Sequence, residues 1–348
     1  MPQTSNALIR RRIVLGALCS FTLLAAACGS GSGSGAAGGG STGAAKKYQI
    51  AVIPKGTTHE FWKSINAGAI KAERELKKSG VDVQVIWKGP IREDDREQQI
   101  QVVEGFLSQG VSGIVLAPLD SKALVRPVEE AKAANIPTVI FDSGLDSKNI
   151  VSYVATDNEK GGQLAAEHLG KILGGKGKVL MLRYQEGSAS TELREKGFLE
   201  GMKAFPNITV VSSDQYSGPT RDTAKRAAEN LLNRYGSQLD GIFCPNESSA
   251  GGMLLALQDL GRAGKVKFVG FDSSQVFLDA MKRKEMDGFV LQNPFEMGYR
   301  AVKTIVAHLR GEQVPPVIDT GVTIVTPENM DSDAMKALLS PPIAEFLQ

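Results

Sequence analysis

Short apolar runs alternate with longer amphipathic segments from Tyr48 onward, and this alternation restricts the possible folds more than any other feature of the sequence. The runs expected to be strands read YQIAVIP, VDVQVIW, GIVLA, TVIF, KVLML, ITVVS, GIFC, KFVGF and GFVLQ. Helices are expected between most of them, at 59–79, 93–109, 121–134, 158–173, 189–204, 219–235, 247–261 and 294–310. Strands that are apolar on both faces and alternate with helices predict α/β architecture with parallel, doubly wound sheets.

The number of strands predicts two lobes, because about nine strands in roughly 280 residues are too many for one sheet of ordinary size. A repeated ending supports this division: VIFDS at 139–143 and VGFDS at 269–273 both close an apolar run with Phe-Asp-Ser. Ligands of open α/β sheets bind beyond the carboxyl ends of the strands, where Asp142, Asn246, Asp272 and Gln292 are expected. The alternative is that these side chains only cap the following helices.

The N-terminal region is typical of an exported chain. Arg10, Arg11 and Arg12 precede IVLGALCSFTLLAAA, 15 apolar or small residues that are too few to span a bilayer comfortably. Residues 1–27 are therefore predicted to be a secretory signal, with a short membrane anchor as the alternative. A general secretory route and a twin-arginine route both fit the basic start.

Cys28 stands between this signal and a tract without charge or large side chains, GSGSGSGAAGGGSTGAA. Residues 28–46 are predicted to be a flexible linker, because such a composition cannot bury apolar surface. A Cys in this place resembles the lipobox of bacterial lipoproteins, although Ala25 stands where Leu is usual. The resemblance implies acylation of Cys28 and attachment to a membrane, inner or outer.

Charge and cysteine content argue against a nucleic acid partner and against an internal disulfide. Of the 40 basic and 38 acidic residues, only the three arginines lie before position 28, so 37 basic residues remain in the rest of the chain. A body so close to neutral gives no electrostatic reason to expect a nucleic acid partner. Cys244 is the single Cys after position 28, so the body has no internal disulfide and Cys244 is expected to be a buried thiol.

No motif for a cofactor, a metal or a nucleophile is convincing. The G-x-G-x-x-G at 33–38 lies inside the linker, with no strand before it. His59, His168 and His308 are far apart and lack the spacing of zinc ligands. We therefore expect no cofactor, no metal and no catalytic residue.

Several stretches together resemble the periplasmic sugar-binding proteins of the ribose-binding type, which share their fold with the sugar-sensing domain of the lactose-repressor family. These stretches are IAVIPKGTTHEFW, IVLAPLDSKAL, ANIPTVIFDS, VATDNEKGGQLAAEHL, REKGFLEGM, GIFCPNESSAGGMLLAL and FVGFDSS. The resemblance implies the type I periplasmic binding protein fold, in which two Rossmann-like lobes joined by a three-stranded hinge hold a ligand between them. A repressor is excluded, because a signal and linker occupy the place of a helix-turn-helix.

The family architecture gives expected boundaries. The first lobe is expected at 47–155 plus 294–320, the second at 156–293 plus 321–326, and a C-terminal tail at 327–348. The crossings between the lobes are expected near 155–157, 292–294 and 320–322.

The resemblance also implies a set of sugar contacts. Asp142 and Asp272 would each present a carboxylate from one lobe, and charged acceptors of this kind bind hydroxyls strongly. Further expected contacts are Arg194, Asn246, Gln292, the aromatic pair Phe61 and Trp62, His59 and Ser143. Packing in the core is the alternative for Trp62. Ser143 and Ala117 stand where the family often has Arg and Asn, so the ligand is not expected to be a ribose-like pentose.

The expected function is extracytoplasmic binding of a monosaccharide or similar polyol by a lipid-anchored monomer that delivers it to the permease subunits of an ABC importer. A sensor subunit that presents a sugar or furanosyl signal to a membrane receptor is the second possibility. The third is a surface carbohydrate-active enzyme that uses Asp142 and Asp272 as a carboxylate pair.

Overall fold

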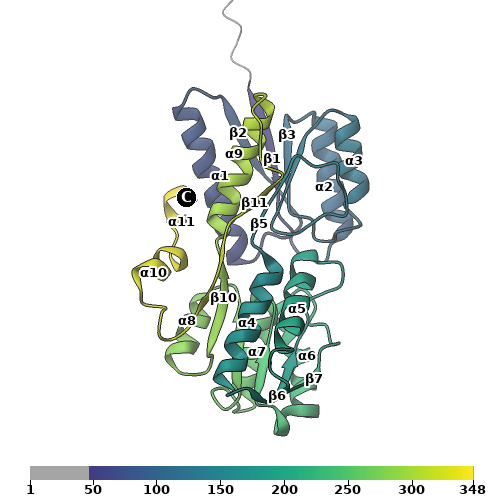
Figure 1. The fold of residues 1–348 in the computed structure, drawn as a ribbon. Helices are drawn as coiled ribbons and strands as arrows, with labels where there is room; N and C mark the ends of the chain where they lie inside the picture. The colour runs from purple at the N-terminus through teal and green to yellow at the C-terminus, as the bar shows by residue number, and fades with distance from the viewer. Residues whose placement is uncertain (1–46, 348) are drawn as a thin grey trace, which may run out of the picture. The chain divides into compact units, whose positions relative to one another are not determined.

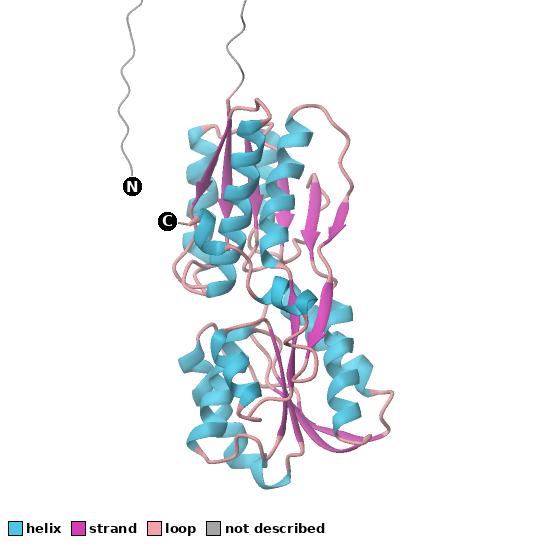
Figure 2. Cartoon of the chain, turned by 90° about the vertical axis from the view of Figure 1, so that its left-hand side faces the viewer, coloured by secondary structure: helices cyan, strands magenta, loops and turns pink. Residues whose placement is uncertain are grey.

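The computed structural model describes residues 47–347. The predicted signal at 1–27 and the linker at 28–46, with Cys28, lie outside the described residues. Residues 47–347 form two α/β lobes, each built around a six-stranded sheet (Figures 1 and 2). The predicted fold class of two doubly wound lobes is therefore confirmed.

The first sheet has the strand order β11-β5-β4-β3-β1-β2, and all its neighbours are parallel. Its strands are β1 (Tyr48–Ile53), β2 (Val83–Trp87), β3 (Gly113–Leu116), β4 (Thr138–Phe141), β5 (Ser152–Ala155) and β11 (Val317–Asp319). Helices α1 (Glu60–Lys78) and α9 (Pro294–Leu309) cover one face, and α2 (Arg96–Gln109) and α3 (Val125–Ala133) cover the other. β1 begins at the end of the lobe that lies away from the second lobe (Figure 1).

The second sheet has the order β12-β10-β9-β8-β6-β7, in which only β12 is antiparallel to its neighbour. Its strands are β6 (Lys176–Met181), β7 (Asn207–Ser212), β8 (Gly241–Phe243), β9 (Lys267–Phe271), β10 (Gly288–Gln292) and β12 (Val322–Val325). One face packs against α4 (Asn158–Ile172) and α5 (Ala189–Met202). The other packs against α6 (Arg221–Tyr235), α7 (Glu247–Asp259) and α8 (Gln275–Lys282), and a 3₁₀ turn at Gly236–Gln238 follows α6.

The structure contains short elements that the apolar pattern did not predict, among them β5, β11, β12 and α8. The two helices expected from 93 and 121 begin later, at Arg96 and Val125. Asp95 caps the first of these by accepting a hydrogen bond from the amide of Gln98. Before the second helix, the carboxylate of Asp120 accepts hydrogen bonds from two loop amides and holds residues 120–124 as a turn. A side-chain cap therefore sets the start of α2, whereas α3 begins where the turn held by Asp120 ends, without a side-chain cap on its first amides.

The chain passes between the two sheets at three places, from β5 to α4, from β10 to α9 and from β11 to β12. Two of these crossings are hydrogen-bonded to each other. The amide of Thr320 donates to the carbonyl of Ala155 at 3.1 Å, and the hydroxyl of Thr156 donates to the carbonyl of Gly321 at 2.5 Å. After β12 the chain forms two short helices, α10 (Asp333–Leu339) and α11 (Ile343–Phe346).

Two glycines set the distance between α4 and α5. A Cβ atom on Gly162 would lie 2.0 Å from the carbonyl oxygen of Arg194, and one on Gly197 would lie 2.0 Å from the carbonyl oxygen of Glu159. The two helix backbones therefore touch at both points, and only glycine permits this approach. Because Arg194 lies on α5, this contact also fixes the position of a predicted site residue.

We expect Gly162→Ala to lower the free energy of unfolding by about 1–3 kcal/mol, because the methyl group must push the two helices apart. Gly105→Ala is the matched control, since Gly105 is also inside a helix but has no atom within 4 Å of its missing Cβ. That control is expected to stabilise the protein slightly. Urea unfolding of both variants measures the difference, and equal stability of the two would contradict the close-contact argument.

Candidate functional site

A small cavity of about 30 Å³ lies between the two lobes, where the carboxyl ends of both sets of strands meet. The first lobe lines it with Lys55, His59, Phe61, Trp62, Glu93 and Asp142. The second lobe lines it with Tyr184, Ser190, Thr191, Arg194, Asn246, Glu247, Asp272 and Gln292. This is the position at which open α/β sheets bind ligands.

Most of the residues predicted from the sequence meet in this cavity, and Ser143 does not line it. Those that line it are Asp142, Asp272, Arg194, Asn246, Gln292, Phe61, Trp62 and His59. The hydroxyl of Ser143 is buried and accepts a hydrogen bond from the amide of Ser190 at 3.1 Å. Ser143 therefore joins the first lobe to the second beside the cavity.

Asp142 and Asp272 occupy equivalent positions in the two lobes. Each follows a strand in the left-handed conformation, with φ of 59° and 67°. Each amide donates to the carbonyl of the neighbouring strand, at Val154 for Asp142 and at Val290 for Asp272. Asp is among the few non-glycine residues that adopt this conformation readily. The repeated Phe-Asp-Ser ending thus encodes the same turn twice.

The helix-cap alternative is wrong for Asp142, whereas Asp272 caps a helix other than the one that follows it: its Oδ2 accepts a hydrogen bond at 3.1 Å from the amide of Glu247, the first residue of α7. No helix follows β4 directly, and the N-cap of α8 is Ser274. The helix-cap alternative is correct for Asn246, whose side chain accepts a hydrogen bond from the amide of Ser249 at 3.1 Å and caps α7. The amide nitrogen of Asn246 donates to the hydroxyl of Ser248 at 3.1 Å.

Every charged side chain that lines the cavity has an oppositely charged partner. The ammonium of Lys55 lies 3.5 Å from Asp142, His59 lies 2.8 Å from Glu93, and Arg194 lies 3.9 Å from Asp272. Glu247 pairs with Arg221, which reaches it from α6. Burial raises the pKa of Asp142, and the charge of Lys55 opposes this shift. Burial also raises the pKa of Asp272, opposed first by the charge of Arg194.

Arg194 is fixed from several sides. Its Nε donates to the side-chain oxygen of Asn158 at 2.8 Å, and Nη1 donates to the carbonyl of Pro245 at 3.0 Å. The guanidinium lies over the ring of Phe271, 3.9 Å from its centre. A guanidinium held in this way presents its remaining N–H groups in a fixed direction.

Gln292 has a buried oxygen without a partner. Its amide nitrogen donates to Oδ1 of Asp272 at 2.6 Å. Its Oε1 has no hydrogen-bond partner among residues 47–347, although the side chain is buried. Because a buried polar atom without a partner is costly, this oxygen is suited to accept a hydrogen bond from a ligand.

Glu93 joins the two lobes and was not predicted. Its carboxylate accepts hydrogen bonds from Nε1 of Trp62 at 2.7 Å, from His59 and from the hydroxyl of Tyr184 at 2.8 Å. Burial alone would lower the pKa of His59, but the hydrogen bond and charge of Glu93 outweigh burial and raise it to about 9. Burial alone would raise the pKa of Glu93, yet His59 and Lys55 hold it at about 2.

Trp62 serves the core and the cavity together. Its side chain is 2% exposed, and its ring packs edge-on against the ring of Phe141, with 6.3 Å between the two ring centres. It also lines the cavity, so the packing alternative and the ligand-contact expectation are compatible. In the second lobe the aromatic residue that lines the cavity is Tyr184, whereas Tyr216 is 40% exposed and does not line it.

Lys55 is the second residue that sequence reasoning missed. Its ammonium is buried and donates to the hydroxyls of Ser188 at 3.1 Å and Ser190 at 3.0 Å, both in the second lobe. A signal was present, because Lys55 lies just beyond the carboxyl end of β1, where the rule that selected Asp142 also applies.

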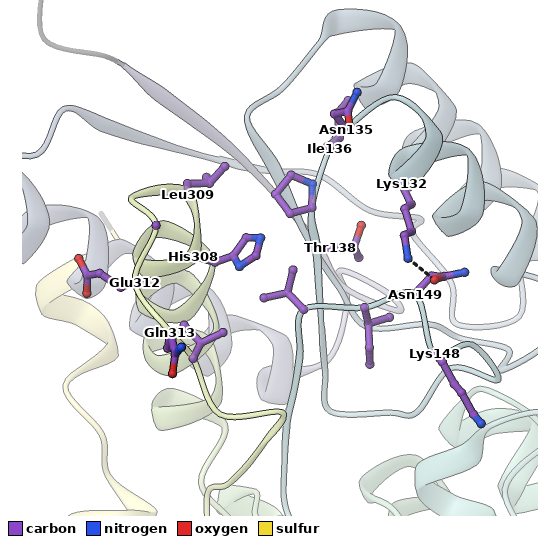
Figure 3. A pocket seen from close by; sticks show the side chains of 15 residues that line it. Lys132, Asn135, Ile136, Thr138, Lys148, Asn149, His308, Leu309, Glu312 and Gln313 are labelled. Atoms are coloured by element: carbon purple, nitrogen blue, oxygen red, sulfur yellow. Dashed lines mark hydrogen bonds between the residues drawn. The ribbon is translucent and has the colours of Figure 1, made fainter.

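A larger hollow lies elsewhere in the first lobe, around Thr138, His308 and Asn149 (Figure 3). It opens near the amino end of β4, away from the carboxyl edge of the sheet. Lys132 and Asn149 are hydrogen-bonded to each other there, and Asn149 also bonds Glu129. Lys132, Asn149 and Glu129 thus satisfy one another, whereas the buried hydroxyl of Thr138 has no hydrogen-bond partner among residues 47–347.

Residues 47–347 contain neither a candidate metal site nor a membrane-spanning helix. In this part of the chain, no group of three or more His, Cys, Asp or Glu side chains is placed to bind a metal ion. None of its helices is long and apolar enough to cross a membrane. Cys244 is a free, buried thiol, and burial raises its pKa well above the ordinary value.

The fold and the cavity are those of a two-lobed binding protein. Residues 50–313 match the periplasmic binding protein domain, and the chain belongs to this family. It is 32% identical over 284 residues to the D-allose-binding periplasmic protein of Escherichia coli, covering 79% of this chain and 89% of that protein.

Solved structures agree with this assignment. A carbohydrate transporter solute-binding protein from Agrobacterium radiobacter, in complex with D-arabinose, is 34% identical with a TM-score of 0.79, over 84% of this chain and 99% of that one. An ABC transporter solute-binding protein from Agrobacterium vitis with bound D-fucose is also 34% identical with a TM-score of 0.79, over 84% of this chain and 100% of that one.

We expect the free energy of unfolding to decrease as the pH rises above neutral, because His59 then loses its proton. A histidine whose folded pKa of about 9 exceeds its ordinary value of 6.5 stabilises the folded state fully below pH 6.5 and progressively less as the pH rises through 9. The loss is on the order of 1–3 kcal/mol between pH 6 and pH 10. In His59→Gln this pH dependence is expected to disappear, whereas the exposed control His308→Gln should retain it. Melting temperatures of both variants and of the parent protein between pH 6 and pH 10 test this expectation. The same pH dependence in His59→Gln as in the parent would contradict it.

Proposed function

We propose that this protein binds an uncharged monosaccharide or similar polyol between its lobes and delivers it to the permease subunits of an ABC importer. The observation that carries the proposal is the charge balance of the cavity, in which each charged lining residue is paired within the protein. A charged ligand would leave a buried charge without a partner, which is strongly unfavourable. A polyol adds only hydroxyl groups.

The hydrogen-bonding groups of the cavity suit hydroxyls. Asp142 and Asp272 offer carboxylate oxygens from opposite lobes, and Oε1 of Gln292 offers a free acceptor. Arg194 supplies donors from a fixed guanidinium. Phe61 and Trp62 add aromatic rings that suit the C–H face of a pyranose. The similarity to proteins that bind D-allose, D-arabinose and D-fucose supports this class of ligand.

Binding without chemistry is part of the proposal. A glycosidase needs one carboxyl group that stays protonated and another that stays ionised, so its two environments must shift the two pKa values apart. Here burial raises the pKa of both Asp142 and Asp272, and a cation lies near each. Two such similar carboxylates are suited to accept hydrogen bonds from one ligand.

Export and lipid attachment complete the proposal. The order of basic residues, apolar run and Cys28 supports a signal at 1–27 and acylation of Cys28, followed by a linker to residue 46. Membership of the periplasmic binding protein family supports an extracytoplasmic location. We propose that the protein acts there as a lipid-anchored monomer.

We expect Asp142→Asn and Asp272→Asn each to weaken ligand binding by roughly 2–4 kcal/mol, because the amide loses the charge and half of the acceptor sites. The ligand is first found by a thermal-shift screen of neutral monosaccharides and polyols, since a ligand specific for the folded state raises the melting temperature. Calorimetry then compares the variants with Asp331→Asn, an exposed control. Unchanged affinity in both site variants, or turnover of a glycoside, would refute the proposed role of the aspartates.

For the anchor, Cys28→Ser is expected to release the mature protein from the membrane fraction, because no thiol remains for acylation. Cys19→Ser, inside the predicted signal, is the matched control and should stay with the membrane. Membrane fractionation with immunodetection gives the answer. The lipoprotein interpretation is wrong if the Cys28 variant stays membrane-bound without accumulating unprocessed chain.

A further inference from the structure

The C-terminal helices rest on different lobes. On α10, the side chains of Met335, Leu338 and Leu339 pack against the hydrophobic core of the second lobe. On α11, the main chain and the ring of Phe346 contact the first lobe. Residues 333–347, here called the C-terminal strap, therefore connect the lobes outside the three crossings of the chain (Figure 1).

The anchor on the first lobe is built around Arg74 of α1. Its Nη1 donates to the carbonyl of Glu345 at 2.9 Å, so the guanidinium binds the free carbonyl end of α11. The same guanidinium lies 5.2 Å from the ring of Phe346, and that ring packs 5.8 Å from Phe295 of α9. A cation at a helix C-terminus and over an aromatic ring is favourable in both respects.

The link between the two anchors is short and stiff. Only Ser340, Pro341 and Pro342 separate α10 from α11. Proline fixes φ, and an extended chain advances at most about 3.3–3.6 Å per residue. The amide of Ile343 donates to the carbonyl of Pro341 at 2.7 Å, so the link is folded into a turn. Opening this turn lengthens the link by only a few ångström, because three residues reach at most about 10 Å when extended.

The strap lies beside the ligand cavity. A hollow under it is walled by Leu338, Pro341 and Ile343 on one side. On the other side the same hollow is lined by Phe61, Asp272 and Gln292, which also line the ligand cavity. A change in the strap thus occurs next to the ligand-contact residues of both lobes.

We propose that the C-terminal strap is a non-covalent fourth connection that holds the lobes together and slows their separation. Contacts present only when the lobes are together favour that arrangement by their own free energy. A wide separation of the lobes requires either α11 to leave α1 or α10 to leave the second-lobe core, because opening the turn in the link adds only a few ångström. The inference concerns the movement of the lobes, and it rests on the proposed function only for its effect on ligand release.

The test measures the distance between the lobes in the full chain without ligand. Spin labels at Gln109→Cys on α2 and Asn230→Cys on α6 report it, since both positions are exposed and Cys244 is buried. Cys19→Ser and Cys28→Ser remove the other thiols. One variant carries Arg74→Ala with Phe346→Ala, and a second has roughly six Gly and Ser residues inserted between Ser340 and Pro341 to slacken the link. Arg126→Ala, on an exposed side chain of α3, is the control.

We expect both strap variants to raise the ratio of molecules with separated lobes to molecules with closed lobes about tenfold, which corresponds to a loss of one or two kcal/mol of free energy that favours the closed state. The control is expected to leave this ratio unchanged. The inserted variant keeps both anchors, so its result does not depend on how well α11 folds. An unchanged distance distribution in the inserted variant would overturn the proposal. So would a parent protein whose lobes are already mostly separated without ligand.

A second measurement separates this inference from the proposed function. With a sugar found by thermal shift, the strap variants are expected to release it about tenfold faster in stopped-flow experiments. If no sugar or polyol binds, the proposed function fails, while the distance measurement still decides whether the strap restrains the lobes.

Discussion

The carboxylate of Glu93 lies buried between the lobes and accepts hydrogen bonds from side chains of both. A buried charge is tolerable only when donors surround it, and removing one of them is costly. His59 and Trp62 are held in the cavity wall by this carboxylate, and Tyr184 reaches it from the second lobe. The carbonyl of Glu93 also accepts from Gln185 at 2.9 Å. The geometry of the first-lobe wall therefore depends on contact with the second lobe.

Lys55 is a buried charge of opposite sign to Glu93, and it too is held by side chains of both lobes. Its ammonium is 3.5 Å from Asp142 of its own lobe and bonds two hydroxyls of the other lobe. The loop that carries Lys55 is held by Gln99. The fully buried side chain of Gln99 donates hydrogen bonds to the carbonyls of Pro54 and Ala117. Ala117 thus contributes a backbone acceptor that ties β3 to the loop carrying Lys55, although its side chain has no polar group.

The sequence predicted the fold class and the two aspartates because both follow from local rules. Apolar runs mark buried strands, and a polar residue at the end of a parallel strand lies at the ligand-binding edge. Glu93 escaped this reasoning because it lies in the run REDDRE, which is typical of a solvated surface. Its burial depends on Tyr184, 91 positions away in the chain, and no local pattern predicts such a contact. The short strands β11 and β12 were missed for a similar reason, since each is held by a partner strand distant in sequence.

The start of β1 at the far end of the first lobe bears on how the body meets a membrane transporter. A lipid on Cys28 would hold the protein by that end, with the mouth of the cavity about one lobe away. The 19-residue helix α1 gives the lobe a height of at least about 28 Å. The 19 residues from 28 to 46 reach roughly 65 Å when fully extended. A linker with this reach, well beyond the length of α1, would let the tethered protein turn over, so that the cleft faces the bilayer while the lipid stays in place.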